Sequence, residues 1–72
     1  MDEQTQVWEA AYAKFKEIQQ DIEPHAALFW RTKPHRTGHG WWRMSMKLIF
    51  PSGFSVRLNY WWRNGKYWSI AN

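Results

Sequence analysis

The amino-acid sequence predicts an α+β fold, with one N-terminal amphipathic helix packed on one face of a three- to four-stranded antiparallel β-meander. Apolar residues recur with helical spacing over about residues 3–22, and they alternate with polar residues over 41–50 and 54–62. The dipeptide Asn64-Gly65 follows the second alternating segment, and this pair is a strong short signal for a β-hairpin. We therefore expect a single small domain over residues 1–72, with its sheet at about residues 27–71.

The predicted helix is defined by an apolar stripe that follows the i, i+3/i+4, i+7 rule and fills an arc of roughly 140°. Its members are Val7, Trp8, Ala11, Tyr12, Phe15, Ile18 and Ile22. Asp2 or Thr5 is a suitable N-cap. Glu23-Pro24 ends the helix, because the residue before a proline is pushed out of helical geometry.

The strands are expected after Pro24, where the hydrophobic period changes from 3.6 to 2. We expect them at residues 27–31, 41–50, 54–62 and 67–71. Residues 32–40 contain proline and two glycines among basic residues, so they predict a flexible basic loop. Pro51-Ser52-Gly53 has the composition of a tight turn between two strands.

A three-residue turn at 51–53 fixes which residues face each other across the central hairpin. One face is then apolar and available to the helix, with the pairs Phe50–Phe54, Leu48–Val56, Met46–Leu58, Met44–Tyr60 and Trp42–Trp62. The other face carries Lys47–Arg57, Ser45–Asn59, Arg43–Trp61 and Trp41–Arg63. If Asn64-Gly65 forms a two-residue turn, Trp68 joins Trp61 on this second face and Lys66 faces Arg63; a longer loop would turn Trp68 inward. Turn chemistry favours the first arrangement.

Charge is segregated along the chain. All six acidic residues lie before residue 24, and with two lysines they give that segment a net charge of −4. Residues 25–72 carry eight basic residues and no acid, a net charge of +8, together with six of the seven tryptophans. Cations suit phosphates and flat rings suit bases, so this composition indicates a nucleic-acid partner.

The leading hypothesis is a non-catalytic module that binds single-stranded DNA or RNA on the basic, aromatic face of the sheet. The bases would stack on Trp41, Trp61 and Trp68. The phosphates would be bound by Arg43, Lys47, Arg57, Arg63 and Lys66. The loop Lys33-Pro34-His35-Arg36 would clamp the backbone, with Lys33 and Arg36 as its cations. Like charges directly opposite each other, as at Lys47 and Arg57, destabilise a sheet, which suggests that an anion is expected there. The alternative is that the Trp–Arg neighbours simply stabilise a small domain.

Protein–protein interaction is the second class of function. Trp, Tyr, Met and Arg are enriched at the centres of interfaces. The same face could therefore dock on an acidic protein surface, as an inhibitor or accessory factor of a larger machine that itself handles nucleic acid. It could also close a homodimer. Salt dependence and quenching of tryptophan fluorescence by an oligonucleotide discriminate these alternatives.

We expect neither catalysis nor a cofactor or metal. His35 and His39 are four residues apart, but they lie in a Pro/Gly-containing loop, and no carboxylate or cysteine follows residue 23 to complete a site. No apolar run approaches the roughly 18–20 residues of a membrane span. The first residues are acidic and polar, unlike a signal peptide, so a cytoplasmic location is expected.

Overall fold

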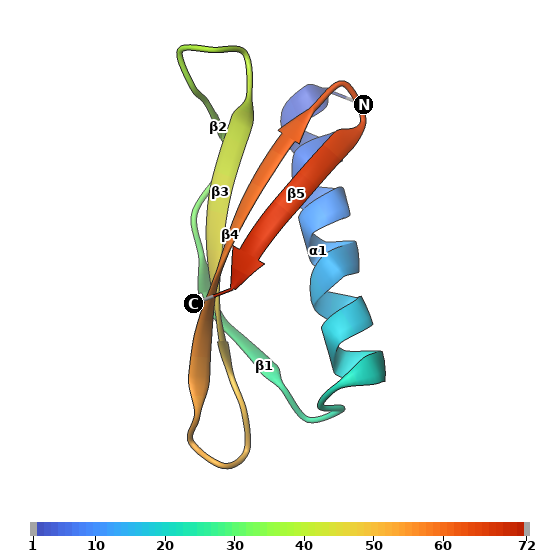
Figure 1. Ribbon diagram of the computed structural model, residues 1–72, viewed down its shortest axis with the longest axis vertical. Coiled ribbons are helices and arrows are strands. Elements are labelled where there is room, and N and C mark those ends of the chain that lie inside the picture. The colour runs from blue at the N-terminus through green and yellow to red at the C-terminus, as the bar shows by residue number, and fades with distance from the viewer. Residues whose placement is uncertain (1, 72) are drawn as a thin grey trace.

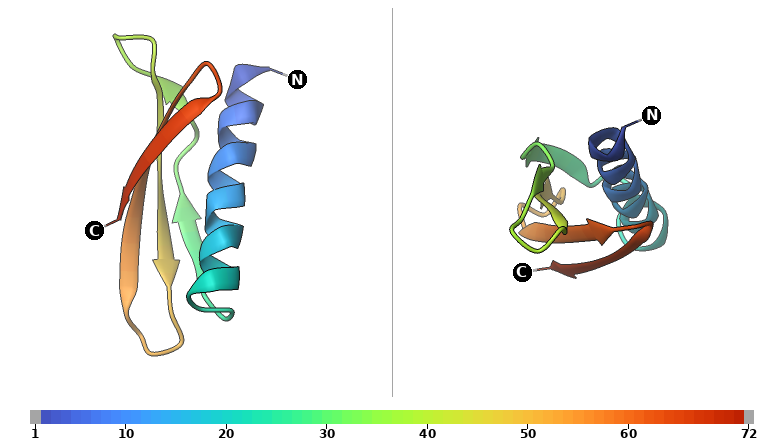
Figure 2. Two further views of the ribbon diagram at one scale, coloured as in Figure 1. Left: turned by 45° about the vertical axis from the view of Figure 1, so that its right-hand side comes forward. Right: turned by 90° about the horizontal axis from the view of Figure 1, so that it is seen from above.

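The computed structural model, which describes residues 2–71, contains one helix and a five-stranded antiparallel sheet. The elements are α1 (Glu3–Asp21), β1 (Ala27–Arg31), β2 (His35–Arg36), β3 (Trp42–Ile49), β4 (Ser55–Arg63) and β5 (Lys66–Ala71). The helix runs along one face of the twisted sheet, as Figures 1 and 2 show from three directions. The predicted α+β architecture is therefore confirmed.

Helix α1 begins where the sequence predicts. The Asp2 carboxylate accepts a hydrogen bond from the backbone N–H of Thr5 at 2.8 Å, which makes Asp2 the N-cap. This bond favours the charged carboxylate and lowers the pKa of Asp2. The helix ends at Asp21, one residue before the expected end, and the N–H of Ile22 still donates to the carbonyl of Ile18 at 2.9 Å.

The apolar stripe of α1 is narrower than predicted. Val7, Ala11 and Phe15 are buried against the sheet, and Trp8 and Ile18 pack at the margin. Tyr12 and Ile22, by contrast, are 38 % and 70 % exposed. Residues spaced by four form a single line along the helix, and it is this line that faces the core, while the flanking residues are at most partly buried.

The strand order is β1-β3-β4-β5, and β2 pairs with another stretch of β3. The prediction of a flexible loop over residues 32–40 is wrong in part, because this segment contains β2. His35 pairs with Arg43, and Arg36 pairs with Trp42. The segment is further anchored by the side-chain amide of Gln4, which donates to the carbonyl of the buried Pro34 at 2.9 Å. A two-residue strand has no period that a sequence pattern could reveal.

The register of the central hairpin is the predicted one. Strands β3 and β4 pair Met46 with Leu58 and Lys47 with Arg57, and the remaining pairs follow in step. The turn at Asn64-Gly65 contains two residues, both with positive φ of 50° and 80°, as a type I′ turn requires. It places Lys66 opposite Arg63 and Trp68 opposite Trp61, so Trp68 does not turn inward.

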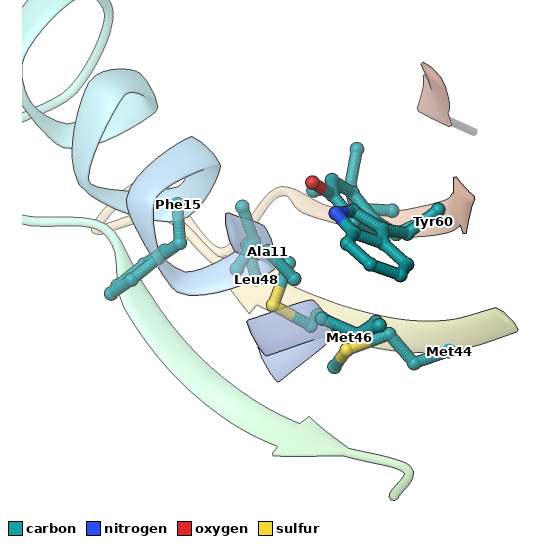
Figure 3. Packing of buried hydrophobic residues seen from close by; sticks show 9 residues of the cluster. Ala11, Phe15, Met44, Met46, Leu48 and Tyr60 are labelled. Atoms are coloured by element: carbon teal, nitrogen blue, oxygen red, sulfur yellow. The ribbon is translucent and has the colours of Figure 1, made fainter. Parts of the chain in front are cut away.

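The core lies between α1 and the β3–β4 hairpin (Figure 3). Three helix residues meet a layer of sheet residues consisting of Met44, Met46, Leu48, Leu58, Tyr60 and Trp62. The hydroxyl of Tyr60, in this layer, and Nε1 of Trp42, which packs against it, are buried without a hydrogen-bond partner among the described residues. The Tyr60 ring also stacks on Tyr67, with ring centroids 5.2 Å apart.

A β-bulge in β1 places Leu28 and Trp30 on opposite faces of the sheet, although regular alternation would put them on the same face. Leu28 pairs with Leu48 on the helix side, but the register shifts before Trp30, which pairs with Lys47 on the opposite side. The next residue, Arg31, returns to the helix side, where its guanidinium carbon lies 4.0 Å from the centroid of the Trp8 ring. The bulge therefore adds Trp30 to the sheet face that the helix does not cover.

Candidate nucleic-acid interface

We call the sheet face opposite α1 the outer face. No helix or strand within residues 2–71 covers it (Figure 2). Strand pairing arranges its side chains in four rows across the sheet. Three of them are Trp30–Lys47–Arg57, Ser45–Asn59–Ile70 and Arg43–Trp61–Trp68. The fourth is the pair Arg63–Lys66 together with Trp41, which precedes β3 and whose ring lies against the Arg63 guanidinium. The basic and aromatic residues that lie far apart in the sequence thus form one continuous surface.

Three tryptophans of the outer face each lie against an arginine. The distances from guanidinium carbon to ring centroid are 5.5 Å for Arg57–Trp30, 5.3 Å for Arg43–Trp61 and 5.9 Å for Arg63–Trp41. Each contact contributes about 0.5–1 kcal/mol when exposed to solvent. The arginines are thereby held over the rings rather than extended into solvent, so cations and aromatic surfaces alternate across the face.

Trp61 is enclosed on both sides of its ring. It stacks on Trp68 with centroids 4.1 Å apart and an interplanar angle of 7°. Because β4 lies between β3 and β5, Arg43 approaches Trp61 from the other side. Trp68 lies on the edge strand and is 46 % exposed, so the ring face pointing away from Trp61 is open. The base-stacking position expected at Trp61 is therefore available at Trp68 instead.

Two cross-strand pairs on the outer face join like charges. Lys47 lies opposite Arg57, and Arg63 lies opposite Lys66. The ion pair present within residues 2–71 is on the helix, between Lys14 and Glu17 at 3.5 Å, so no described carboxylate neutralises these cations. The two pairs are six residues apart along β4, or about 20 Å. The outer face therefore presents two separate centres of uncompensated positive charge.

Between these centres lies a polar pair of small side chains. The Ser45 hydroxyl donates to the side-chain oxygen of Asn59 at 3.0 Å, and Thr32 accepts the backbone N–H of Ser45 through its own hydroxyl at 3.0 Å. Ser45 and Asn59 are only 5 % and 8 % exposed, although no backbone element covers them. These two hydrogen bonds hold the middle of the outer face in a fixed arrangement.

Two hollows lie at one end of the outer face, one beside the loop between β2 and β3 and the other beside the β4–β5 turn. The larger one, with a volume of about 440 Å³, is mainly apolar and is lined by Thr37, His39, Trp41, Trp61 and Trp68. The smaller one, of about 290 Å³, is lined by Trp41, Arg63, Asn64 and Lys66. Trp41 belongs to both, so an aromatic hollow adjoins a cationic one.

Eight of the ten predicted binding residues lie on the outer face. The two exceptions are the loop residues. Lys33 lines a hollow beside the start of α1 with Gln4 and Trp8, and Arg36 lies against Trp42 at 5.7 Å on the helix side of the sheet. Pairing of β2 with β3 puts His35, rather than Arg36, on the outer face beside Arg43. The expected backbone clamp at Lys33 and Arg36 is thus not adjacent to the other cations.

Sequence reasoning missed Trp30 as a member of this surface, and it placed His35 in the loop clamp and not on the sheet face. Regular alternation within residues 27–31 puts Leu28 and Trp30 on one face, and only the bulge separates them. The remaining signal for Trp30 was compositional, since it is a tryptophan within the basic part of the chain.

No known protein family, curated protein or solved structure matches the chain. Among the described residues, no three His, Asp or Glu side chains come together in a metal-binding arrangement. Within residues 2–71, no helix has both the length and the apolar composition that crossing a membrane requires.

Proposed function

We propose that the protein is a non-catalytic module that binds single-stranded DNA or RNA on the outer face of its sheet. The observation that supports this most directly is the coexistence of Trp–Arg stacks with two uncompensated cation pairs on one uncovered face. Proteins that bind single strands combine a positive surface, which follows the phosphates, with aromatic rings on which bases stack.

The arrangement of the rows favours a single strand over a duplex. Bases must be unpaired and unstacked before they can lie on a ring such as Trp68. The two cation pairs, about 20 Å apart along β4, suit phosphates at separate positions of an extended strand. The acidic residues all precede residue 24, mainly on α1, so repulsion from a polyanion would orient the outer face toward it. Because nucleic acid is an intracellular partner, we also propose a cytoplasmic location.

The experiment that tests this function is a titration of tryptophan fluorescence with a mixed-sequence single strand of about ten nucleotides, repeated at several salt concentrations. Quenching should accompany binding, and log Kd should rise with log salt concentration by about 0.7 for each phosphate contacted. We expect a total slope of roughly two to four, because four cations form the two like-charge pairs. Absence of binding at low salt would exclude the function.

Docking on an acidic protein is a second candidate, favoured by one observation. Strand β5 lies at the edge of the sheet, and its Tyr67, Trp68 and Ile70 side chains are 50 %, 46 % and 45 % exposed. An open edge strand with apolar side chains is a surface to which another protein can add a strand. In that case the protein would act as an inhibitor or accessory factor of its partner. An oligonucleotide would then not be expected to quench its tryptophan fluorescence.

A further inference from the structure

We infer that the end of the outer face around Trp41 is a subsite for one unstacked nucleotide, with its base in the apolar hollow and its phosphate on Arg63 and Lys66. This inference rests on the proposed function and adds to it a defined position along the surface. Its basis is that Trp41 lines both hollows, so a ligand filling the two must join an aromatic group directly to an anion.

The apolar hollow has the character of a base-binding site. Its volume of about 440 Å³ falls in the range of about 300–1,000 Å³ that is usual for small-molecule sites. Three tryptophans contribute to its lining, and any base can stack on or pack against an aromatic ring. The hydroxyl of Thr37 and the imidazole of His39 are the polar side-chain groups in the lining, and they can hydrogen-bond to a base edge.

The loop wall of this hollow is preformed. The N–H of Thr37 donates to the carbonyl of Trp41 at 2.7 Å and the N–H of Gly40 donates back to the carbonyl of Thr37 at 3.4 Å. The hydroxyl of Thr37 also accepts the N–H of His39 at 3.4 Å. These bonds close the loop upon itself, so a ligand does not have to order the chain before it binds.

The cationic hollow has the character of a phosphate-binding site. Arg63 and Lys66 are paired directly across the two-residue turn, and each would be destabilised by the other unless an anion lies between them. Arg63 lies 5.9 Å from the Trp41 ring, so its charge is held at the edge of the apolar hollow. Arginine can bind a phosphate with two parallel hydrogen bonds, and lysine adds a further charge.

The ligand chemistry is therefore a base linked to a phosphate, and it has two sources: a free nucleotide or one nucleotide within a strand. A nucleoside lacks the anion and inorganic phosphate lacks the base, so each of them can fill only one of the two hollows. The two sources are distinguished by comparing a nucleoside 5′-monophosphate with oligonucleotides in which one terminal nucleotide is intact or lacks its base.

The experiment is a ¹H–¹⁵N NMR titration that follows the indole N–H signals of the tryptophans and the backbone signals of Arg63 and Lys66. We expect the nucleoside 5′-monophosphate to shift the Trp41, Arg63 and Lys66 signals more than nucleoside or phosphate alone. Trp41→Ala should weaken this binding roughly 5- to 150-fold, the range expected when one stacked base is lost. Tyr12→Ala is the control and should change it less than about twofold, since Tyr12 is an exposed ring on α1, on the other side of the sheet from the outer face.

The possible outcomes distinguish a failure of the proposed subsite from a failure of the proposed function. If oligonucleotides bind but the monophosphate leaves Trp41 unshifted, and removing a terminal base has no effect, the subsite is excluded and the proposed function stands. If the monophosphate binds at Trp41 but no oligonucleotide binds, the site is one for free nucleotides and the proposed function fails. Equal losses in Trp41→Ala and Tyr12→Ala would also exclude the subsite. Trp41→Phe, which keeps a ring, should restore much of the affinity and rules out misfolding as the cause of a loss.

Discussion

Trp61 and Trp68 stack nearly parallel across β4 and β5, with ring centroids 4.1 Å apart and an interplanar angle of 7°. Arg43 approaches Trp61 from the side of β3, so the three residues form a short stack that ends at the open ring face of Trp68. The partly buried Trp61 ring fixes the orientation of the exposed Trp68 ring, and such aromatic pairs contribute about 0.5–1.5 kcal/mol beyond the area they bury. Trp61 thus supports Trp68, and the outer ring face of Trp68 is open to a stacking ligand.

Trp68→Ala should weaken binding of a single-stranded oligonucleotide roughly 5- to 150-fold, because it removes one stacking position. Fluorescence anisotropy of a labelled oligonucleotide measures this directly. The matched control is Tyr67→Ala, which removes a similarly exposed ring from the same strand but from the other face, where Tyr67 stacks on Tyr60. Equal losses in the two variants would mean that β5 contributes through sheet integrity and not through Trp68.

The substitution Lys47→Gln should stabilise the fold and weaken nucleic-acid binding at the same time. It relieves the like-charge pair with Arg57, so the free energy of unfolding should rise by about 0.2–1 kcal/mol. It also removes one phosphate contact, so the salt slope of oligonucleotide binding should fall by about 0.7. Urea unfolding and binding at several salt concentrations are the two measurements.

Lys33→Gln is the control for this prediction, because it removes the same charge near the start of α1, away from the outer face. It should leave both the stability and the salt slope close to their original values. If Lys33→Gln and Lys47→Gln reduce the slope equally, binding follows the net charge of the chain and is not confined to the outer face.

Much of the outer face could be predicted because its geometry is local. Side chains alternate with a period of two, so one turn of known length fixes every pair along a hairpin. The three residues at 51–53 placed Lys47 opposite Arg57, and the same count placed Arg43 opposite Trp61. Asn64-Gly65 accepts positive φ at both positions, which selected a two-residue turn and placed Trp68 beside Trp61.

The remaining features depend on contacts between residues far apart in the chain. The bulge before Trp30 shifts β1 against β3, and no local pattern in residues 27–31 marks it. Strand β2 exists because His35 and Arg36 meet β3, and this pairing is what turns Arg36 away from the outer face. The covering of Trp61 on both ring faces likewise requires side chains from two neighbouring strands. These three features decide which of the basic and aromatic residues can reach a ligand.

Gly65→Ala should disrupt the Trp61–Trp68 stack through the backbone. Gly65 has a φ of 80°, and a residue with a Cβ atom in this region costs about 1–2 kcal/mol. The strain should loosen the β4–β5 hairpin and weaken the circular-dichroism signal that arises from coupling of the two stacked indoles. Gly38→Ala is the control, because the Gly38 φ is not positive and an added Cβ atom meets nothing within 4 Å. Retention of the indole signal in Gly65→Ala would show that the stack does not depend on this turn.

Tyr60→Phe should stabilise the core, and it should do so most strongly at alkaline pH. The Tyr60 side chain is fully buried, and its hydroxyl has no hydrogen-bond partner among the described residues. Removing an unsatisfied buried hydroxyl should raise the free energy of unfolding by about 1 kcal/mol at neutral pH. Burial, with a smaller contribution from Tyr67, also raises the pKa of Tyr60 above its ordinary value of 10.0.

This shift in the pKa of Tyr60 fixes the sign of the pH dependence. Above about pH 10 the unfolded chain loses the Tyr60 proton while the folded chain keeps it, so the unfolded state binds fewer protons. The stability of the wild type should therefore fall by up to about 1.4 kcal/mol per pH unit above pH 10 from this group. Tyr60→Phe should remove that part of the slope in urea unfolding curves recorded between neutral and alkaline pH. Identical alkaline slopes in wild type and Tyr60→Phe would mean that the Tyr60 hydroxyl reaches solvent in the folded protein.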